Sequence, residues 1–344
     1  MMKILILNTT GLGNILLFLP AYRYLLENCK NIDITVVFDS RWYNDEFMRY
    51  QFKEAKRLIK YPFNKKKIFQ LLFSYLKMII RKYDYVLMPF SHITYRRYLF
   101  LKFIPSRKRI YFTQSKRKKK KFVFLEDKND EHYIIKNLKQ VKYILKDSND
   151  EIHHDIKNYI FLNNKDYFEK TESELWVGIH PGGNVEFNPF RRWPHNYYNK
   201  LIELLKTNHK KIKIFIFGVG EYEKKLVNNV IKGHENISIR VHDRPLMEVA
   251  LKIKNCDIFI GNDSGLMHLA SGLGIKTFGI LGPTNHHRTG PYGKDTHTIR
   301  INLECSPCYD IGSYKSCKHF SCLKLIKPEN VFKIIKAKVR SEII

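Results

Sequence analysis

The chain has 344 residues, of which 44% are hydrophobic and 14% aromatic, enough to build the cores of two domains and to exclude wholesale disorder. Its 61 Lys and Arg against 33 Asp and Glu give a formal net charge of +28, which predicts an anionic partner such as nucleic acid, acidic lipid or a phosphorylated substrate. Six cysteines do not make a disulfide scaffold, the start MMKILILNTTGLGN lacks the pattern of a signal peptide, and no apolar run is long enough to span a membrane, so we expect a protein of a reducing compartment.

Short apolar runs alternate with amphipathic stretches along the whole chain. In the first half we predict strands at Lys3–Asn8, Ile34–Phe38, Asp84–Met88, Arg109–Phe112 and Phe122–Phe124, with helices such as Asn14–Leu26 and Lys66–Lys82. In the second half we predict strands at Leu175–His180, Lys213–Phe217, Ile237–Val241, Asp257–Ile260, Lys276–Leu281 and Thr298–Ile301, with helices at Asn196–Asn208, Tyr222–Lys232, Leu246–Lys254, Leu266–Leu273 and Pro328–Val339. Apolar strands that alternate with helices are typical of parallel sheets covered on both faces.

This alternation occurs twice, on either side of a polar stretch near Asn163–Glu174. The sequence therefore predicts an α/β protein made of two Rossmann-like, doubly wound domains that face each other across a cleft. Ligands of such sheets bind beyond the carboxyl ends of the strands, which indicates the loops after Ile6, His180, Phe217 and Ile260.

Two lysine runs, Lys65–Lys67 and Lys116–Lys121, are typical of solvated loops or helix ends. The first of them opens Lys65–Lys82, a helix with basic ends that is apolar nearly all round. Most of its apolar surface is expected to pack on the first sheet. Any remainder beside the lysines would suit an anionic bilayer surface, so we also keep a membrane-surface interpretation.

The loop Thr9–Asn14 follows the first strand and opens a helix. Gly11 and Gly13 allow the backbone to turn tightly and to approach a ligand, and a helix N-terminus favours anions. The loop lacks the third glycine of the dinucleotide fingerprint, and only Asp39 supplies an acid at the end of the second strand, which disfavours a dinucleotide-dependent oxidoreductase. A tight turn without a ligand remains the alternative.

The run from Gly261 to Ala270 follows a strand of the buried type. Asp263 or Ser264 is well placed to cap the next helix, and Gly265 permits close approach to its first turn. Free N–H groups there, with the helix dipole behind them, predict a pyrophosphate site that His268 can reach from one turn in. The alternative is a capped helix with a buried histidine.

Further motifs occur in a fixed order. They are the opening GLGN loop, His180-Pro181-Gly182-Gly183, Arg191-Arg192-Trp193-Pro194, Phe217-Gly218 followed by Glu221 and Glu223, Asn262-Asp263-Ser264-Gly265-Leu266-Met267-His268, and Gly282-Pro283-Thr284. Together these motifs resemble glycosyltransferase family 9, whose best-known members are the lipopolysaccharide heptosyltransferases. The resemblance covers nearly the whole chain and implies the GT-B fold of two Rossmann-like domains.

The resemblance implies an acceptor-binding domain over 1–165, a nucleotide-sugar-binding domain over 166–327, and a C-terminal helix within 328–344 that packs back towards the first domain. It implies an inverting enzyme that moves a heptose-type sugar from ADP-heptose, or a similar nucleotide sugar, to a lipopolysaccharide-core or related lipid-linked acceptor. The enzyme would be a cytoplasmic protein bound peripherally to the inner face of the cytoplasmic membrane. The resemblance also implies that catalysis requires no cofactor. The alternatives are another sugar donor for capsule or glycan assembly and, outside the family, a basic nucleic-acid-binding protein, for which no recognised motif is present.

The resemblance also assigns roles to single residues. Asp263, Ser264, Gly265 and His268 would surround the diphosphate and sugar of the donor, and Gly182 and Gly183 would offer backbone amides to phosphate. Arg191, catalytic together with Asp263, would neutralise charge that grows on the leaving diphosphate. Glu221 or Glu223 would bind the ribose or, alternatively, serve the start of a helix. Gly11, Gly13 and Asn14 would lie on the acceptor side.

Asn14 departs from the family pattern, in which an aspartate at this position is the proposed general base. An amide cannot take up a proton at neutral pH, so the base role does not transfer. Four alternatives follow. Another carboxylate, with Asp39 the nearest by loop position, serves as the base; the proton leaves late with the help of water; Asn14 only orients the acceptor; or the protein transfers the sugar slowly or not at all.

Four cysteines near the C-terminus, Cys305, Cys308, Cys317 and Cys322, form a C-x2-C-x8-C-x4-C pattern. Four clustered thiols can bind a structural zinc ion in a reducing compartment. Packing thiols or a disulfide remain open. Cys29 and Cys256 are isolated, and we expect both to be buried.

Overall fold

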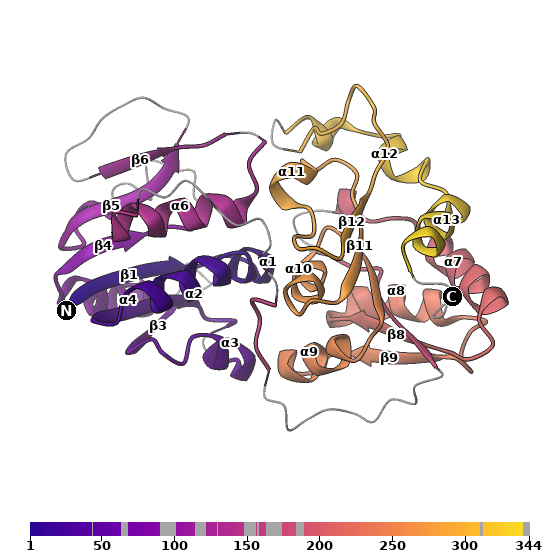
Figure 1. Cartoon of the computed structure of the whole chain (residues 1–344), viewed down its shortest axis with the longest axis horizontal. Helices are drawn as coiled ribbons and strands as arrows, with labels where there is room; N and C mark the ends of the chain where they lie inside the picture. Colours follow the sequence, from indigo (N-terminus) through magenta and orange to yellow (C-terminus); the bar gives the residue numbers. More distant parts are fainter. Residues whose placement is uncertain are drawn as a thin grey trace. The chain divides into compact units, whose positions relative to one another are not determined.

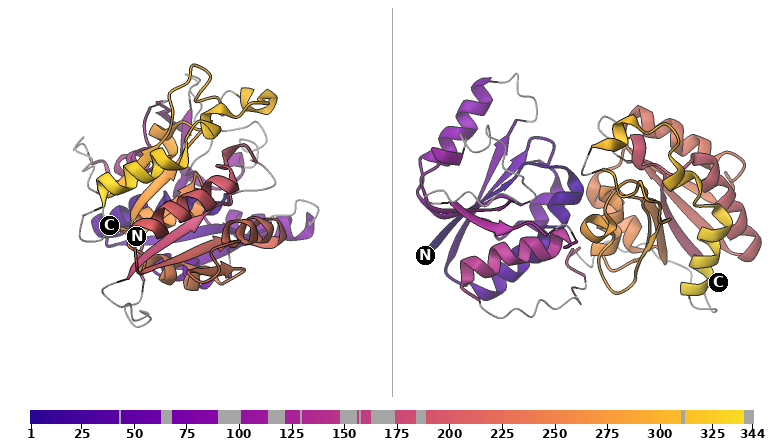
Figure 2. Two further views of the ribbon diagram at one scale, coloured as in Figure 1. Left: turned by 90° about the vertical axis from the view of Figure 1, so that its right-hand side faces the viewer. Right: turned by 90° about the horizontal axis from the view of Figure 1, so that it is seen from above.

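A computed structural model describes residues 1–42, 44–62, 68–89, 101–113, 122–128, 130–147, 156, 158–162, 174–183, 189–309 and 312–339. The two lysine runs and the polar stretch 163–173 lie outside the described residues. The chain divides into two compact units, Met1–His154 and Asp155–Ile344, and each is described by itself (Figures 1 and 2).

The described part of the first unit holds a six-stranded sheet in the order β3-β2-β1-β4-β5-β6, with every pair parallel. The strands are β1 (Met2–Asn8), β2 (Ile32–Asp39), β3 (Arg57–Tyr61), β4 (Tyr83–Leu87), β5 (Ser106–Thr113) and β6 (Phe122–Glu126). The helices are α1 (Leu12–Leu16), α2 (Leu19–Asn28), α3 (Glu46–Gln51), α4 (Ile68–Ile79) and α6 (Tyr133–Leu145). α2 packs against α6, and α4 packs against β3.

The described part of the second unit repeats this plan, with a parallel six-stranded sheet in the order β12-β11-β10-β7-β8-β9. Its strands are β7 (Leu175–His180), β8 (Ile212–Gly218), β9 (Ser238–His242), β10 (Ile258–Asn262), β11 (Lys276–Ile280) and β12 (Thr296–Ile299). Its α-helices are α7 (His195–Asn208), α8 (Gly220–Ile231), α9 (Leu246–Lys254), α10 (Gly265–Gly272), α11 (His286–Thr289), α12 (Ser321–Lys324) and α13 (Pro328–Lys338). Short 3₁₀ helices lie at Pro189–Arg191 and Ser313–Ser316.

The prediction of two Rossmann-like, doubly wound sheets is confirmed. In each sheet the chain reverses its direction of winding between the first and fourth strands, which are β1 and β4 in one unit and β7 and β10 in the other. The carboxyl ends at such a reversal are where doubly wound sheets bind ligands. Gly261 of β10 pairs with His180 of β7, so the loops that follow these two strands start side by side.

The predicted helix over Asn14–Leu26 is wrong in one respect, because it is broken into α1 and α2. Pro20 lies in the first turn of α2, where its missing N–H is harmless, but in a continuous helix it could not donate to the carbonyl four residues earlier. β3 was missed since it is an edge strand in which only Ile59 is buried.

The C-terminal helix α13 carries its buried residues Val331 and Ile335 into the hydrophobic core of the second unit, and it packs against α7. That the helix also packs back towards the first domain, as the resemblance implies, stays a prediction. Amphipathic spacing identifies the apolar face of a helix but not the surface that this face covers. Among the described helices, none combines the length and apolar character needed to cross a bilayer.

Candidate active site

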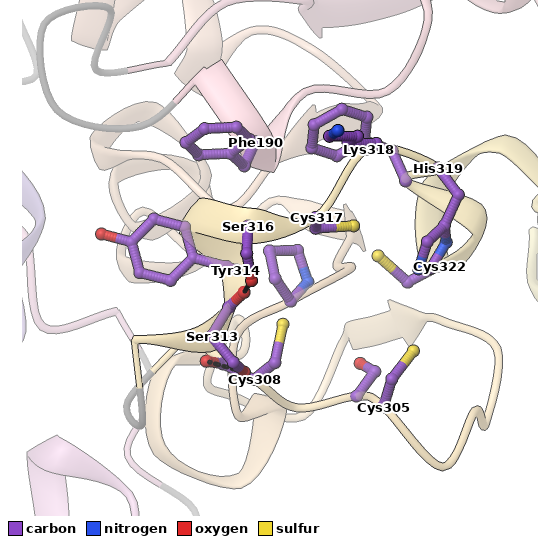
Figure 3. Close-up of a pocket in the computed structure, with 13 residues that line it drawn as sticks. Phe190, Cys305, Cys308, Ser313, Tyr314, Ser316, Cys317, Lys318, His319 and Cys322 are labelled. Atoms are coloured by element: carbon purple, nitrogen blue, oxygen red, sulfur yellow. Dashed lines mark hydrogen bonds between the residues drawn. The ribbon is translucent and has the colours of Figure 1, made fainter.

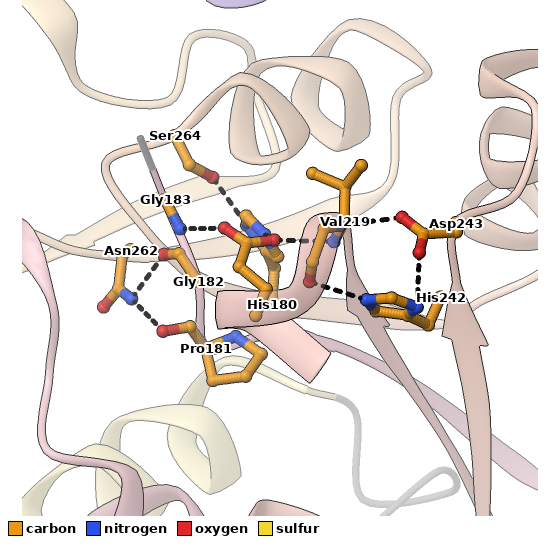
Figure 4. Close-up of polar contacts among 11 residues, drawn as sticks. His180, Pro181, Gly182, Gly183, Val219, His242, Asp243, Asn262 and Ser264 are labelled. Carbon is orange, nitrogen blue, oxygen red and sulfur yellow. Dashed lines mark hydrogen bonds and ion pairs between the residues drawn. The ribbon is translucent and has the colours of Figure 1, made fainter. Parts of the chain in front are cut away.

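Asn262 joins three segments at the carboxyl edge of the second sheet. It ends β10 and is fully buried. Its Nδ2 donates to the carbonyls of Pro181 and Gly182, and its Oδ1 accepts from Trp193 N and Tyr198 Oη, all at 2.9 Å. Figure 4 shows the two bonds to the loop after β7. Because both donors and both acceptor positions are used, this side chain fixes the loop after β7 and the start of α7 against β10.

His180 is the centre of a buried polar chain that links β7, α8 and α10 (Figure 4). Its Nδ1 lies 2.9 Å from Ser264 Oγ, and its Nε2 lies 3.3 Å from Glu223 Oε2. The same carboxylate accepts hydrogen bonds from Gly183 N at 2.7 Å and Val219 N at 2.8 Å. Burial would raise the pKa of Glu223, but His180 and the two backbone amides outweigh burial and hold that pKa below its ordinary value. Glu223 is therefore an ionised, buried anchor.

These contacts change the roles that the sequence gave to the loop after β7. The Gly183 amide, predicted to meet phosphate, donates to Glu223. A Cβ at Gly182 would overlap the Glu223 carboxylate, so close packing of that side chain requires glycine here. Glu223 itself accepts from Val219, the residue before α8, which matches the alternative that it serves the start of a helix. Glu221, by contrast, is exposed and forms a surface ion pair with Lys224 at 3.2 Å.

Ser264 occupies the N-cap position of α10 by its backbone, but its side chain makes no capping hydrogen bond in the described structure. Its hydroxyl lies instead beside His180 Nδ1. The first-turn amides of α10, which begins at Gly265, therefore have no side-chain acceptor from the N-cap. This leaves the helix start suited to an external anion.

Arg191, Asp263 and His268 form a second group beside that helix start. Arg191 Nη1 lies 3.3 Å from Asp263 Oδ2, and Thr289 Oγ1 lies 3.4 Å from the same oxygen. The guanidinium also lies over the ring of Tyr309, 4.1 Å from its centroid. Nε of Arg191 is buried and has no hydrogen-bond partner among the described residues. The cation is thus held in place while part of its hydrogen-bonding capacity stays unused.

His268 is buried 4.0 Å from Asp263 Oδ1, measured from Nε2. Burial lowers its pKa to about 4; Asp263 opposes this shift, and Arg191 adds to it. The imidazole is therefore neutral at pH 7 and can supply a hydrogen bond but no positive charge. Its Nδ1 has no partner within the described ranges.

Arg192 is a candidate to which sequence reasoning gave no role. Its guanidinium lies 4.5 Å from the centroid of the Tyr222 ring, and its Nε and Nη2 are buried without a partner in the part of the chain that the structure describes. In the sequence, Asn262 and His180 likewise stand out only as parts of motifs. The signal that could have found both was a polar residue at the end of a buried apolar strand.

The predicted acceptor residues lie in the first unit. Gly11 is the exposed residue before α1, whereas Gly13 and Asn14 lie within α1 and are partly buried. Asp39, the alternative base, ends β2 and accepts from Arg41 N, Nε and Nη2 at 3.0, 3.0 and 3.3 Å. Both of its oxygens are therefore engaged. Asn8 is fully buried, and neither of its amide atoms has a partner among the described residues.

The four clustered cysteines line one cavity of about 370 Å³ in the second unit (Figure 3). All six cysteines lie within the described residues, and all six are free thiols. Within the described ranges, no group of three or more His, Cys, Asp or Glu side chains is arranged to hold a metal ion. The donor set suits zinc, but this geometry does not assemble it, and structural zinc stays a prediction.

Comparisons with known proteins agree with this architecture. The family model for glycosyltransferase family 9 (heptosyltransferase) matches residues 81–319. The chain is 28% identical to lipooligosaccharide heptosyltransferase 2 of Campylobacter jejuni over 343 residues, which cover 97% of this chain and 98% of that protein. It is 27% identical to lipopolysaccharide heptosyltransferase 2 of Escherichia coli over 140 residues, 39% of this chain and 38% of that protein.

Solved structures share the fold over nearly the whole chain. A family 9 glycosyltransferase from Veillonella parvula superimposes with a TM-score of 0.76 at 18% identity, covering 98% of this chain and 96% of that one. An E. coli heptosyltransferase with ADP-2-deoxy-2-fluoro heptose gives 0.73 at 17% identity, covering 98% and 100%. With a family match over residues 81–319 and the motifs of that match gathered at one sheet edge, this chain belongs to glycosyltransferase family 9 and is a glycosyltransferase.

Proposed function

We propose that this enzyme moves a heptose-type sugar, with inversion, from ADP-heptose or a similar nucleotide sugar to a lipopolysaccharide-core or related lipid-linked acceptor. The observation that carries the proposal is the likeness to the Campylobacter jejuni lipooligosaccharide heptosyltransferase 2 over nearly the full length of both chains. The E. coli heptosyltransferase with an ADP-heptose analogue supports the donor class, since it shares the fold of the whole chain.

The start of α10 would receive the diphosphate of the donor. Amides of the first helical turn point towards an anion placed there, and the helix dipole favours negative charge. Neutral His268 would add a hydrogen bond through Nδ1, the atom that has no partner among the described residues. The Glu223–His180–Ser264 chain would hold the helix start in position, because it ties α8 and β7 to the N-cap residue.

Arg191 would stabilise the leaving group. Cleavage of the bond between sugar and phosphate increases negative charge on the diphosphate, and a cation already in place lowers the energy of that transition state. Asp263 and Tyr309 hold the guanidinium, and its planar fork can bind phosphate oxygens while it stays over the ring. Arg192 lies on the ring of Tyr222 with two unused nitrogens and would add a second cation. The proposal needs no metal ion.

On the acceptor side, Asn14 would orient the attacking hydroxyl. An amide cannot accept its proton, and Asp39 could do so only by giving up hydrogen bonds from Arg41. The proposal therefore has the proton leave late, to water, as the new glycosidic bond forms. Loss of a general base typically slows such a step by about 10²–10⁴-fold.

A lipid-linked acceptor would bring the enzyme to the inner, cytoplasmic face of the cytoplasmic membrane as a peripheral protein. The strongly positive net charge of +28 supports this location, since such acceptors and the surrounding lipids carry negative charge.

A thermal-shift panel of nucleotide sugars, free nucleotides and duplex DNA tests the proposal, because only a ligand of the folded state raises the melting temperature. We expect stabilisation by ADP-sugars, largest for ADP-heptose, and release of ADP when acceptor is added. Stabilisation by UDP- or GDP-sugars alone would favour the alternative donor. Stabilisation by DNA alone would favour the nucleic-acid alternative and overturn the proposal.

A further inference from the structure

The helix α4 carries an apolar face that the described residues of its own unit leave uncovered. Tyr75, Met78 and Ile79 pack into the core of the first unit, in keeping with the predicted packing on the sheet. On the other side of the helix, and at Ile80 directly after its last residue, five large apolar side chains are exposed, with 88% of Phe69 and 78% of Ile80 accessible to solvent. They are Phe69, Leu72, Phe73, Leu76 and Ile80.

These five residues follow the spacing i, i+3, i+4, i+7 and i+11, so they form one continuous stripe along the helix. A second exposed ring lies on a segment that shares the core with α4. Phe103 is 64% exposed, while its neighbours Leu101 and Ile104 pack in the same cluster as Met78. Isolated exposed apolar residues are ordinary in soluble proteins, but a contiguous set of this size marks a contact surface.

Basic side chains lie beside two of the exposed rings. Lys77 is exposed on α4 with its Nζ 4.3 Å from the centroid of the Phe73 ring, and Lys102 Nζ lies 5.9 Å from that of Phe103. Arg81 and Lys82 follow Ile80 in the sequence. In the sequence, Asp84 is the single acidic residue between positions 55 and 125, a region that holds most of the chain's excess of Lys and Arg. Long basic side chains beside exposed rings are suited to place the rings among acyl chains and the charges among phosphates.

We propose that the exposed face of α4, together with Phe103, docks on the surface of an anionic lipid bilayer. Apolar side chains enter the boundary between headgroups and acyl chains, and the flanking lysines and arginines pair with acidic headgroups. The charge pattern favours a lipid surface over an apolar protein partner, because such a partner would not require charges of a single sign beside the apolar face. The inference rests on the proposed function in one respect, namely that a lipid-linked acceptor brings this enzyme to a membrane.

Flotation with vesicles tests the surface. The full-length protein is mixed with vesicles of phosphatidylcholine alone or of phosphatidylcholine with phosphatidylglycerol, and the floating fraction is measured at low and high salt. We expect binding to the acidic vesicles that weakens with salt. The double variant Phe69→Gln, Phe73→Gln should bind them about tenfold or more weakly, because each ring lost removes apolar area from the contact. Leu325→Gln, which removes an exposed leucine of the second unit, is the matched control and should float as the original chain does.

Absence of flotation by the original chain, or equal flotation of the double variant, would overturn the proposal. So would a dimer in gel filtration that disappears in the double variant, because it would identify a second copy of this chain as the occupant. The melting temperature with and without ADP-heptose is recorded for every variant. If ADP-heptose still raises the melting temperature when flotation fails, the docking surface is wrong and the proposed function stands. If ADP-heptose does not raise the melting temperature of the original chain, the proposed function is wrong and the docking surface stands.

Discussion

Arg191 and Asp263 form an ion pair of 3.3 Å that joins the segment before α7 to the segment before α10. The carboxylate is buried, whereas the guanidinium keeps part of its surface accessible and an unused Nε among the described residues. A diphosphate at the start of α10 would meet a cation already held by a carboxylate and by the ring of Tyr309. Such preorganisation makes a cation effective in the transition state.

Replacement of this guanidinium should mainly affect turnover. We expect Arg191→Ala to lower kcat by about 10²–10³-fold, the usual effect of removing one preorganised group that stabilises transition-state charge. Arg191→Lys should recover only part of the activity, since an ammonium lacks the planar fork and the stacking on Tyr309. ADP release under saturating donor measures both. Arg300→Ala, which removes a half-buried arginine that bonds Asn302, is the control. A kcat of Arg191→Ala near that of the original chain would contradict the assignment.

His268 should make stability depend on pH. Its pKa is about 4 in the folded protein, against an ordinary value of 6.5, so the unfolded chain binds more protons between these values. The free energy of unfolding should therefore fall as the pH drops from about 6.5 to about 4, by roughly 1.4 kcal/mol per pH unit for this one group. His268→Gln should remove that part of the slope in denaturant titrations at pH 7, 6, 5 and 4.5.

The control for this titration is His319→Gln, which replaces an exposed histidine and should keep the original slope. The pKa values of His209 and His297 are also lowered by burial. Their contribution to the pH dependence of the free energy of unfolding is the same in the original chain, His268→Gln and His319→Gln. An unchanged slope in His268→Gln would show that His268 titrates normally.

Asn14→Asp restores a carboxylate at the position where the family pattern has one. We expect this variant to keep or raise kcat, by up to about 10²-fold, because a general base would then be available to the acceptor hydroxyl. Rates measured from pH 5 to 9 should show a new dependence on the ionisation of that carboxyl. Asn14→Ala, which lacks both amide and acid, should be slower than either. A folded Asn14→Asp protein without turnover would contradict the proposed role of this loop.

The thiols of the cysteine cavity should differ in reactivity. Burial raises the pKa of Cys322 to about 11 and also raises that of Cys308, while Cys305 is exposed. Because the thiolate is the reactive form, we expect a disulfide reagent at pH 8 to modify Cys305 well before Cys322. Cys305→Ser should therefore lose the fast phase, and Cys322→Ser should keep it.

Metal analysis of the same preparation, purified without chelator, tests structural zinc. If the original chain holds one zinc ion and Cys308→Ser holds none, the cysteines bind zinc. The ion would then protect all four thiols from the reagent, which would contradict the expected difference in their rates. Less than one equivalent, with Cys305 reacting first, would agree with free thiols around the cavity.

Local patterns were sufficient for most of the fold. Continuous apolar strands such as Leu175–His180 and amphipathic helices such as Leu246–Lys254 are recognisable because burial imposes its period on neighbouring residues. Local patterns do not reveal the edge strand β3, because it has a single buried side chain. They also do not reveal the break between α1 and α2, because the apolar pattern continues regularly across it.

The sequence by itself determined the order of the motifs, the family they resemble and the helix start that suits an anion. Only the tertiary structure decided how the side chains are used. Glu223 turns inward to Gly183 and His180, Ser264 bonds His180 instead of capping α10, and Asn262 ties three segments together. These partners lie far apart in the chain and meet because parallel strands bring their carboxyl ends to one edge, where buried polar groups must find partners in whatever the fold places beside them.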